Sequence, residues 1–148
     1  AKREGVTTIL DPAPCRRLAK RILQLVDILT PNEKELAEMT GLPVKTKRDI
    51  ERAGEALLQS GVGEVLATCG GRGVCRLAKR GQQWFPAPRV RAVDTVGAGD
   101  CFNGTLASAL SAGLAGDAAI RFAVGAAARS VIRPGAQPSF PKLKPGAD

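Results

Sequence analysis

Short apolar runs alternate with segments of helical spacing along the 148-residue chain. Val6–Leu10 and the apolar end of residues 27–29 each predict a short buried strand. Between them, Leu18, Ile22 and Leu25 recur at helical spacing and predict the buried face of a helix. Strands that alternate with helices predict an α/β domain built around a largely parallel sheet.

Two further helices are marked by capping boxes, in which a Thr and an acid three residues later satisfy free backbone N–H groups. Thr30 and Glu33 mark the first, with proline at the first helical position, and Gly41 marks its end. Thr46 and Asp49 mark the second, which ends at a glycine. The predicted buried face of this second helix consists of Ile50, Ala53, Leu57 and Leu58.

The second half of the chain continues the alternation. Residues 64–78, EVLATCGGRGVCRLA, read as two strands around a glycine turn, and residues 82–95 are β-rich but broken by proline. A helix follows with Phe102, Leu106, Ala109 and Leu110 on one face. Residues 117–132 form another helix, which is apolar nearly all round and therefore buried. We expect one domain over residues 1–148, with a loose tail at 141–148.

The net charge of +8 is unevenly distributed. Residues 1–64 hold 11 basic and 10 acidic side chains, whereas residues 65–148 hold 11 and 4. Positive potential in the second half suits a polyanion, either a nucleotide polyphosphate or nucleic acid, although a merely solvated basic surface would look the same. Aromatic residues make up 3% of the chain, which is a poor supply for stacking single-stranded bases. No apolar run reaches the roughly 20 residues of a membrane span, so no membrane partner is expected.

The chain contains no histidine, and this excludes several kinds of chemistry. A Ser-His-Asp triad, a Cys-His pair and a His-Glu-x-x-His zinc site cannot form. The four cysteines contain no Cys-x-x-Cys pair, which predicts free thiols in a reducing cytoplasm. Any general base is therefore a carboxylate, a lysine or a cysteine.

The stretch DTVGAGDCFNG at residues 94–104 holds the main candidate site. Backbone N–H groups at a helix start attract phosphate oxygens, and Gly97 and Gly99 let an anion approach the backbone around Ala98. Asp100 could accept a proton from an attacking hydroxyl. An ordinary helix start with loop glycines explains the same letters, and the residues alone leave both interpretations open. A P-loop, a Gly-x-Gly-x-x-Gly after a strand and the protein-kinase motifs are all absent.

The same stretch resembles the C-terminal signature of the ribokinase-like carbohydrate kinases, Asp-Thr-x-Gly-Ala-Gly-Asp-x-Phe-Asn-Gly. DPAP (11–14), TPNEKE (30–35) and TCGGRG (68–73) resemble other stretches of that family in the same order. RPGAQPS (133–139) is most similar to the ribokinases within it. The resemblance covers almost the whole chain.

This resemblance implies a ribokinase-like three-layer α/β/α fold with a largely parallel sheet, truncated so that the N-terminal strands and the lid are missing. The opening AKREG, which looks like the last turn of a helix closed by Gly5, agrees with a chain cut from something longer. The implied activity is ATP-dependent phosphoryl transfer to a sugar hydroxyl, with ribose the first choice. A chain that lacks most sugar-binding residues is expected to be inactive by itself.

The resemblance also assigns roles to individual residues. Asp100 is the implied base, and Gly97, Ala98 and Gly99 form the anion hole. Asn32 and Glu35 match an Asn-x-x-Glu that organises Mg²⁺ near the phosphates; an ordinary helix start is the alternative, although the Thr30–Glu33 box leaves this pair unexplained. The implied nucleotide-binding segment consists of Thr68, Gly70, Gly71, Arg72 and Gly73. A glycine hairpin is the alternative for these residues.

A monovalent cation, K⁺, is implied between two segments rich in oxygen ligands. Its implied ligands come from Asp94, Val96, Ser130, Arg133, Gly135 and Ser139. A surface turn is the alternative for the second segment.

Two other functions stay open. The first is a non-catalytic nucleotide-binding module, and the second and weaker one is a basic nucleic-acid-binding protein. Nucleic-acid binding would weaken steeply with salt and ignore magnesium, whereas nucleotide binding would need it. An exposed sheet edge would favour a homo-oligomer.

Overall fold

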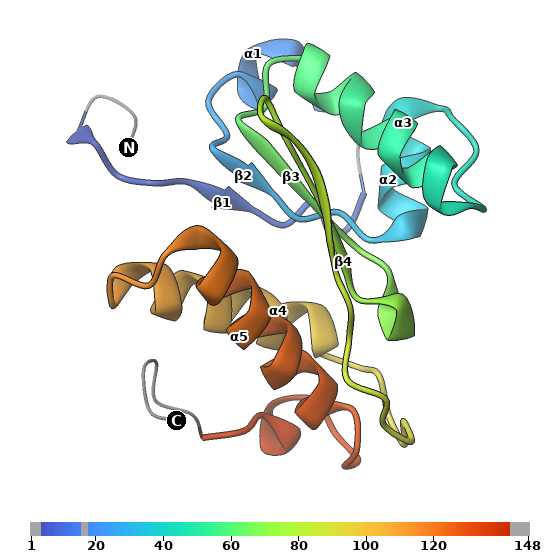
Figure 1. The fold of residues 1–148 in the computed structure, drawn as a ribbon, viewed down its shortest axis with the longest axis vertical. Helices are drawn as coiled ribbons and strands as arrows, with labels where there is room; N and C mark the ends of the chain where they lie inside the picture. The colour runs from blue at the N-terminus through green and yellow to red at the C-terminus, as the bar shows by residue number, and fades with distance from the viewer. Residues whose placement is uncertain (1–3, 16–17, 143–148) are drawn as a thin grey trace. The chain divides into compact units, whose positions relative to one another are not determined.

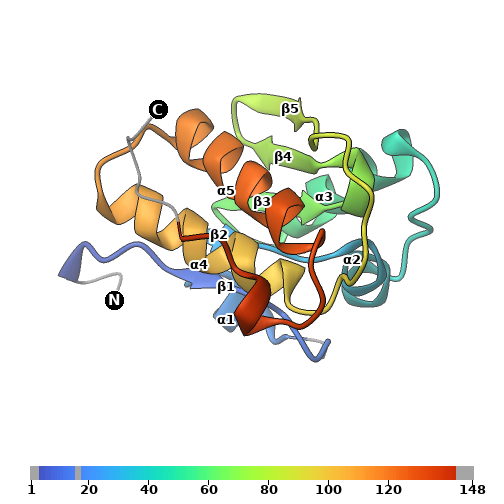
Figure 2. The same ribbon diagram turned by 90° about the horizontal axis from the view of Figure 1, so that it is seen from below.

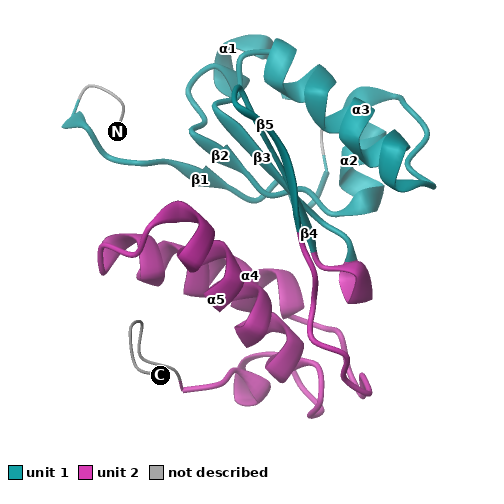
Figure 3. Cartoon of the chain, viewed as in Figure 1, with its two compact units in different colours: residues 1–69, 74–84 teal, residues 70–73, 85–148 magenta. Residues whose placement is uncertain are grey.

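The computed structural model describes residues 4–15 and 18–142. The chain divides into two compact units (Figure 3). The sheet unit comprises residues 1–69 and 74–84, and the helical unit comprises residues 70–73 and 85–148. Of the predicted tail at 141–148, residues 143–148 lie outside the described part, as do residues 1–3 of the predicted N-terminal helix end.

Five strands form one sheet in the order β1-β2-β3-β4-β5 (Figures 1 and 2). They are β1 (Ile9–Leu10), β2 (Ile28–Leu29), β3 (Glu64–Thr68), β4 (Val74–Ala78) and β5 (Gly81–Phe85). The first three are parallel, whereas β3 and β4 pair as an antiparallel hairpin. The predicted α/β sheet is thus confirmed, with its parallel part at β1 to β3. The predicted strand at Val6–Leu10 keeps only its last two residues.

Two helices of the sheet unit, α2 (Glu33–Thr40) and α3 (Lys47–Gln59), pack against one face of the sheet (Figure 1). The helix α3 begins at the predicted Thr46–Asp49 capping box. Its predicted face is confirmed, with Leu58 only partly buried. The sheet residues of this core alternate along the strands, as expected for one face of a sheet. On β3 and β4 they are Val65, Ala67, Cys75 and Leu77, and Leu29 of β2 belongs to the same core.

The helix predicted around residue 20 is a single turn, α1 (Lys20–Leu23). Leu18 is partly buried against the core, but Ile22 and Leu25 are 41% and 59% exposed, so the predicted buried face is wrong for these two residues. Leu23 and Val26 point into the core instead. The reason is that α1 spans only Lys20–Leu23, so Leu18 and Leu25 lie outside the helix and the three residues do not share one helical face.

The helical unit contains α4 (Ala98–Ser111) and α5 (Gly116–Ser130), which pack against each other, and two short 3-10 turns, η2 (Gly70–Arg72) and η3 (Gln137–Ser139). Both long helices were expected, but α5 buries only seven of its fifteen residues, and Arg121 and Arg129 are exposed. Residues 86–95, predicted to be β-rich, form no regular element because Pro86 and Pro88 follow β5 directly. No helix in the described part of the chain is long and apolar enough to cross a membrane.

Candidate functional site

The carboxyl ends of the parallel strands bring α2 beside the end of β3. The N–H of Thr68 donates to the carbonyl of Pro31 over 2.9 Å, and Asn32 forms an isolated parallel bridge with Thr68. The predicted residues Asn32, Glu35 and Thr68 therefore lie at one edge of the sheet unit. Ligands of open α/β sheets bind at this edge, outside the carboxyl ends of the strands.

Asn32 and Glu35 themselves form the capping box of α2. Asn32 Oδ1 accepts from the N–H of Glu35 over 2.9 Å, and Glu35 Oε2 accepts from the N–H of Asn32 over 2.8 Å. The box predicted at Thr30 and Glu33 is wrong, because Thr30 directly follows β2 and its N–H donates to the carbonyl of Leu10 in the neighbouring strand. The pair that seemed to need a functional explanation therefore has a structural role.

This structural role leaves the pair able to face a cation. Glu35 is 9% exposed, and one of its carboxylate oxygens, Oε1, takes no part in the capping bond. Each oxygen that does accept an N–H keeps a second lone pair. Carboxylate and amide oxygens suit Mg²⁺, which usually keeps several waters and few protein ligands. The donor set thus fits the implied ion.

The glycine-rich segment after Thr68 closes the β3–β4 hairpin. The N–H of Gly73 donates to the carbonyl of Gly70 over 3.0 Å. Gly73 has φ +93° and no room for a side chain, because an added Cβ would collide with the carbonyl oxygen of Phe85. Gly70 and Gly71 face open space. The hairpin interpretation is correct, and it leaves the backbone at residues 70–72 accessible to a ligand.

The helix α4 begins at Gly97, which has a left-handed φ of +78°. No side chain caps this helix start, and Asp100 is exposed in its first turn. A Cβ on Gly99 would meet nothing within 4 Å, so the backbone there is open to an approaching group. Free N–H groups at a helix start, together with the helix dipole, favour a bound anion.

Asp94 joins the two segments of the predicted cation site. Its Oδ1 accepts from the N–H of Val96 over 3.0 Å, and its Oδ2 accepts from the N–H of Gly135 over 2.9 Å. These two bonds hold the pKa of the Asp94 carboxyl below its usual range. Asp94 therefore supplies a fixed negative charge beside the main-chain carbonyls of both segments.

The other predicted cation ligands are placed less directly. Ser130 and Ser139 are buried, and their hydroxyls donate to the carbonyls of Ala127 and Ala136 over 2.9 and 2.7 Å. Each hydroxyl oxygen keeps lone pairs that can face a cation. Arg133 is exposed and could contribute only its main-chain carbonyl. One carboxylate and several neutral oxygens suit a hard monovalent ion.

The sequence analysis missed Ala136 and Phe140, which pack against the start of α4. Gly97 has no room for a side chain, because an added Cβ would lie 2.9 Å from the Cβ of Ala136 and 3.2 Å from Cε1 of Phe140. The sequence does not predict this contact, because Gly97 and the segment with Ala136 and Phe140 are about forty residues apart along the chain.

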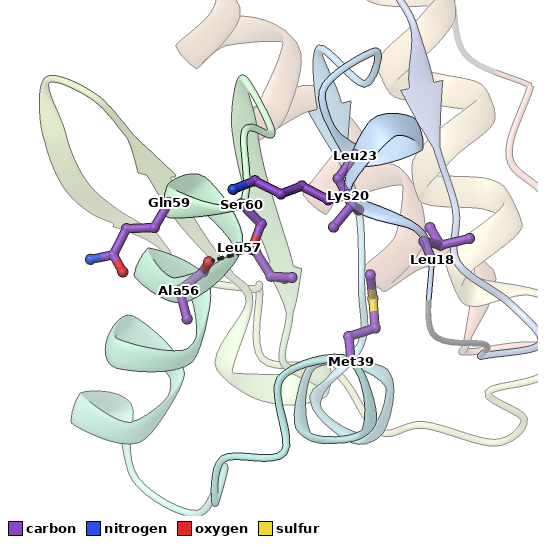
Figure 4. Close-up of a pocket in the computed structure, with 8 residues that line it drawn as sticks. All are labelled: Leu18, Lys20, Leu23, Met39, Ala56, Leu57, Gln59 and Ser60. Carbon is purple, nitrogen blue, oxygen red and sulfur yellow. Dashed lines mark hydrogen bonds between the residues drawn. The ribbon is translucent and has the colours of Figure 1, made fainter.

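A pocket of about 340 Å³ lies elsewhere, in the sheet unit, among α1 and the ends of α2 and α3 (Figure 4). Leu23, Met39 and Leu57 contribute apolar surface to it, and Lys20 adds a charged side chain. None of the predicted site residues lines it. This pocket therefore has no part in the candidate site.

A parallel sheet with a capped helix at its carboxyl edge, accompanied by a glycine-opened helix that carries an acid, is typical of α/β proteins that bind phosphate groups. The chain belongs to the pfkB family of carbohydrate kinases, whose family model matches residues 1–143. The resemblance inferred from the motifs is thereby confirmed.

Individual ribokinases are similar to this chain in sequence and in structure. The ribokinase of Haemophilus influenzae is 40% identical over 95% of this chain. The crystal structure of the Thermotoga maritima ribokinase is 42% identical over 95% of this chain, with a TM-score of 0.85. The structure of Arabidopsis thaliana ribokinase complexed with ribose and ATP is 35% identical over 95%, with a TM-score of 0.87. The match covers 46%, 47% and 46% of these proteins, so this chain spans about half their length.

Proposed function

We propose that this chain supplies the nucleotide-binding and proton-accepting part of an ATP-dependent sugar kinase, with ribose as the first candidate substrate. The observation that carries the proposal is the start of α4, where an uncapped, glycine-opened turn presents its N–H groups next to the exposed carboxylate of Asp100. Membership of a carbohydrate-kinase family supports the same function.

In the proposed reaction, Asp100 accepts the proton of a sugar hydroxyl as the oxygen of that hydroxyl attacks the γ-phosphorus of ATP. The bond from that phosphorus to the bridging oxygen breaks, and ADP leaves. Backbone N–H groups of Gly97, Ala98 and Gly99 donate to the oxygens of the transferred phosphoryl group, and Ala98 gives up its bond to the carbonyl of Thr95 to do so. Such fixed donors act where negative charge is shared in the transition state, at no cost in reorganisation.

The nucleotide is held by the other predicted residues. Thr68 and the exposed segment Gly70–Arg72 line the phosphates, with Arg72 adding positive charge, and buried Gly73 closes the turn of this segment. Asn32 and Glu35 hold Mg²⁺, directly or through its waters, while they cap α2. When bound, Mg²⁺ neutralises phosphate charge that would otherwise oppose the attack.

A monovalent cation completes the proposed site, held by Asp94, the carbonyls near Val96 and Gly135, and Ser139. The fixed negative charge of Asp94 supports this assignment. We place the reaction in the cytoplasm, because ATP is available there and all four cysteines are free thiols.

The decisive experiment uses a chimera in which residues 1–143 replace the matching half of the Haemophilus influenzae ribokinase. We expect magnesium-dependent phosphorylation of ribose, and we expect Asp100→Asn to lower kcat at least about a thousandfold while the Kd for Mg-ATP changes less than about threefold. Asp117→Asn is the matched control, since Asp117 is the acidic residue in the first turn of α5. It should keep wild-type turnover.

A loss below about tenfold, or roughly 1.4 kcal/mol of barrier, would remove Asp100 from the role of base. A chimera that binds Mg-ATP but phosphorylates no sugar would instead favour the non-catalytic nucleotide-binding module. Binding that ignores magnesium and weakens steeply with salt would favour nucleic acid.

A further inference from the structure

The segment that follows α5 packs directly on the residue that opens α4. An added Cβ at Gly97 would lie 2.9 Å from the Cβ of Ala136, 3.2 Å from its Cα and 3.2 Å from Cε1 of Phe140. These atoms occupy the space where any other residue would carry its side chain. The backbone of Gly97 is thus in close contact with both residues.

The same segment is itself firmly held. The N–H of Gly135 donates to Asp94 Oδ2 over 2.9 Å, which ties the segment to the loop before α4. The N–H and the hydroxyl of Ser139 both donate to the carbonyl of Ala136, over 3.0 and 2.7 Å. Ser139 is 3% exposed, so this turn is packed rather than loose.

We infer that Ala136 and Phe140 are positioning residues that fix the start of α4. The start of α4 has no side-chain cap, and its local backbone bonds are those from the N–H of Ala98 to Thr95 over 3.2 Å and from the N–H of Cys101 to Gly97 over 2.9 Å. Glycine has little conformational preference of its own, so the contact with Ala136 and Phe140 supplies a restraint that a side-chain cap would otherwise provide. Because catalytic donors must be held to within about 0.5 Å, this packing should decide how well the first turn meets a phosphoryl group.

The first test needs no enzymatic activity and uses the 148-residue chain. The N–H of Cys101 donates to the carbonyl of Gly97 over 2.9 Å, so its hydrogen exchange reports the first bond of α4. Phe140→Ala should speed this exchange at least about tenfold relative to the N–H of Ala112, which donates to Ser108 at the other end of the helix.

Phe122→Ala is the matched control, because Phe122 is a half-buried phenylalanine on α5 of the same unit. It should leave the ratio of the two exchange rates unchanged. Ala136→Gly removes only one methyl group and provides a milder variant if Phe140→Ala does not fold. An unchanged ratio in the folded Phe140 or Ala136 variant would overturn the inference.

The second test rests on the proposed function and uses the ribokinase chimera. Phe140→Ala should lower kcat at least about tenfold while the KM for ATP changes less than about threefold, because orientation acts mainly in the transition state. The kcat of Phe140→Leu should fall between those of the wild type and Phe140→Ala. An active wild-type chimera with an unaffected Phe140→Ala variant would overturn the positioning role. An inactive wild-type chimera would count against the proposed function, and hydrogen exchange would still decide the positioning role.

Discussion

Asn32 and Glu35 bond each other twice at the start of α2, each side chain accepting from the backbone N–H of the other residue. The bridge between Asn32 and Thr68 holds this helix start at the end of β3. A pair that the family resemblance assigns to magnesium is therefore also the device that begins the helix. The two roles make different demands, because capping needs only acceptor oxygens whereas an ion needs negative charge.

Glu35→Gln separates the two roles. The amide oxygen of glutamine can still accept from the N–H of Asn32, so the free energy of unfolding should change by less than about 0.5 kcal/mol. The loss of charge should weaken Mg-ATP binding at least about tenfold. Unfolding can be followed by the fluorescence of Trp84, the single tryptophan, whose indole N–H donates to Glu51 Oε1 over 2.9 Å.

Glu35→Ala completes this comparison, since it removes both roles. It should cost about 1 kcal/mol of stability as well as nucleotide affinity. If Glu35→Gln binds Mg-ATP as tightly as the wild type, as measured by calorimetry, then Glu35 is only a helix cap.

Much of the fold could be predicted from the sequence because its signals are local. The Thr46–Asp49 box and the apolar spacing of α3 depend on neighbouring residues, and both are confirmed. Thr30 failed as a cap because of a long-range effect: its N–H bonds Leu10 in the neighbouring strand, so the chain at Thr30 stays extended. The prediction that Ile22 is buried was wrong because the apolar spacing does not reveal that α1 spans a single turn.

The candidate site also contains residues that could be predicted from local sequence and contacts that depend on the fold. Asp94, Gly97 and Asp100 could be selected because they lie within one short motif. The contacts of Gly97 with Ala136 and Phe140 could not, because they depend on the path of the chain after α5. The main-chain carbonyls of the proposed cation site could be expected only from the family resemblance of their segments, because a carbonyl ligand does not depend on the residue type.

Asp94 should make stability depend on pH. Its pKa is lowered in the folded state by the N–H groups of Val96 and Gly135, and on unfolding it returns to about 3.8. The stabilisation is therefore fully present above about pH 4 and is lost as the pH falls through the lower folded pKa. Asp94→Asn should lower the thermal midpoint at pH 7, and its difference from the wild type should shrink toward pH 2.

Circular dichroism at constant ionic strength measures both midpoints. Asp49 also has a lowered pKa, but it is present in both proteins and its contribution cancels. A difference in midpoint that stays constant from pH 7 to pH 2 would contradict this account of Asp94.

Potassium should raise the activity of the ribokinase chimera or its affinity for nucleotide, and Asp94→Ala should abolish the response. The reason is that Asp94 joins the two oxygen-rich segments and supplies their negative charge. Turnover should be compared in potassium chloride and in a tetraalkylammonium salt at matched ionic strength, since the bulky cation cannot enter a site lined by carbonyls. Equal turnover in the two salts would exclude a specific cation site.

Three glycines around α4 should respond differently to the same change, the addition of one methyl group. Gly97→Ala places a Cβ against Ala136 at a left-handed φ of +78° and should cost about 1–3 kcal/mol of stability. Gly99 and Gly104 both lie within the helix, and a Cβ on either would meet open space. Gly99→Ala and Gly104→Ala should therefore stabilise the protein by about 0.5–1 kcal/mol each.

The kcat of the chimera should then distinguish Gly99→Ala from Gly104→Ala. If a phosphoryl group approaches the backbone at Gly99, a methyl group there keeps it away, and the more stable Gly99→Ala variant should lose at least about tenfold in kcat. Gly104→Ala, five residues further along α4, should gain the same stability and keep wild-type turnover. Opposite changes in stability and activity at Gly99 cannot come from damage to the fold. Wild-type turnover in Gly99→Ala would show that the phosphoryl group does not approach the backbone at this residue.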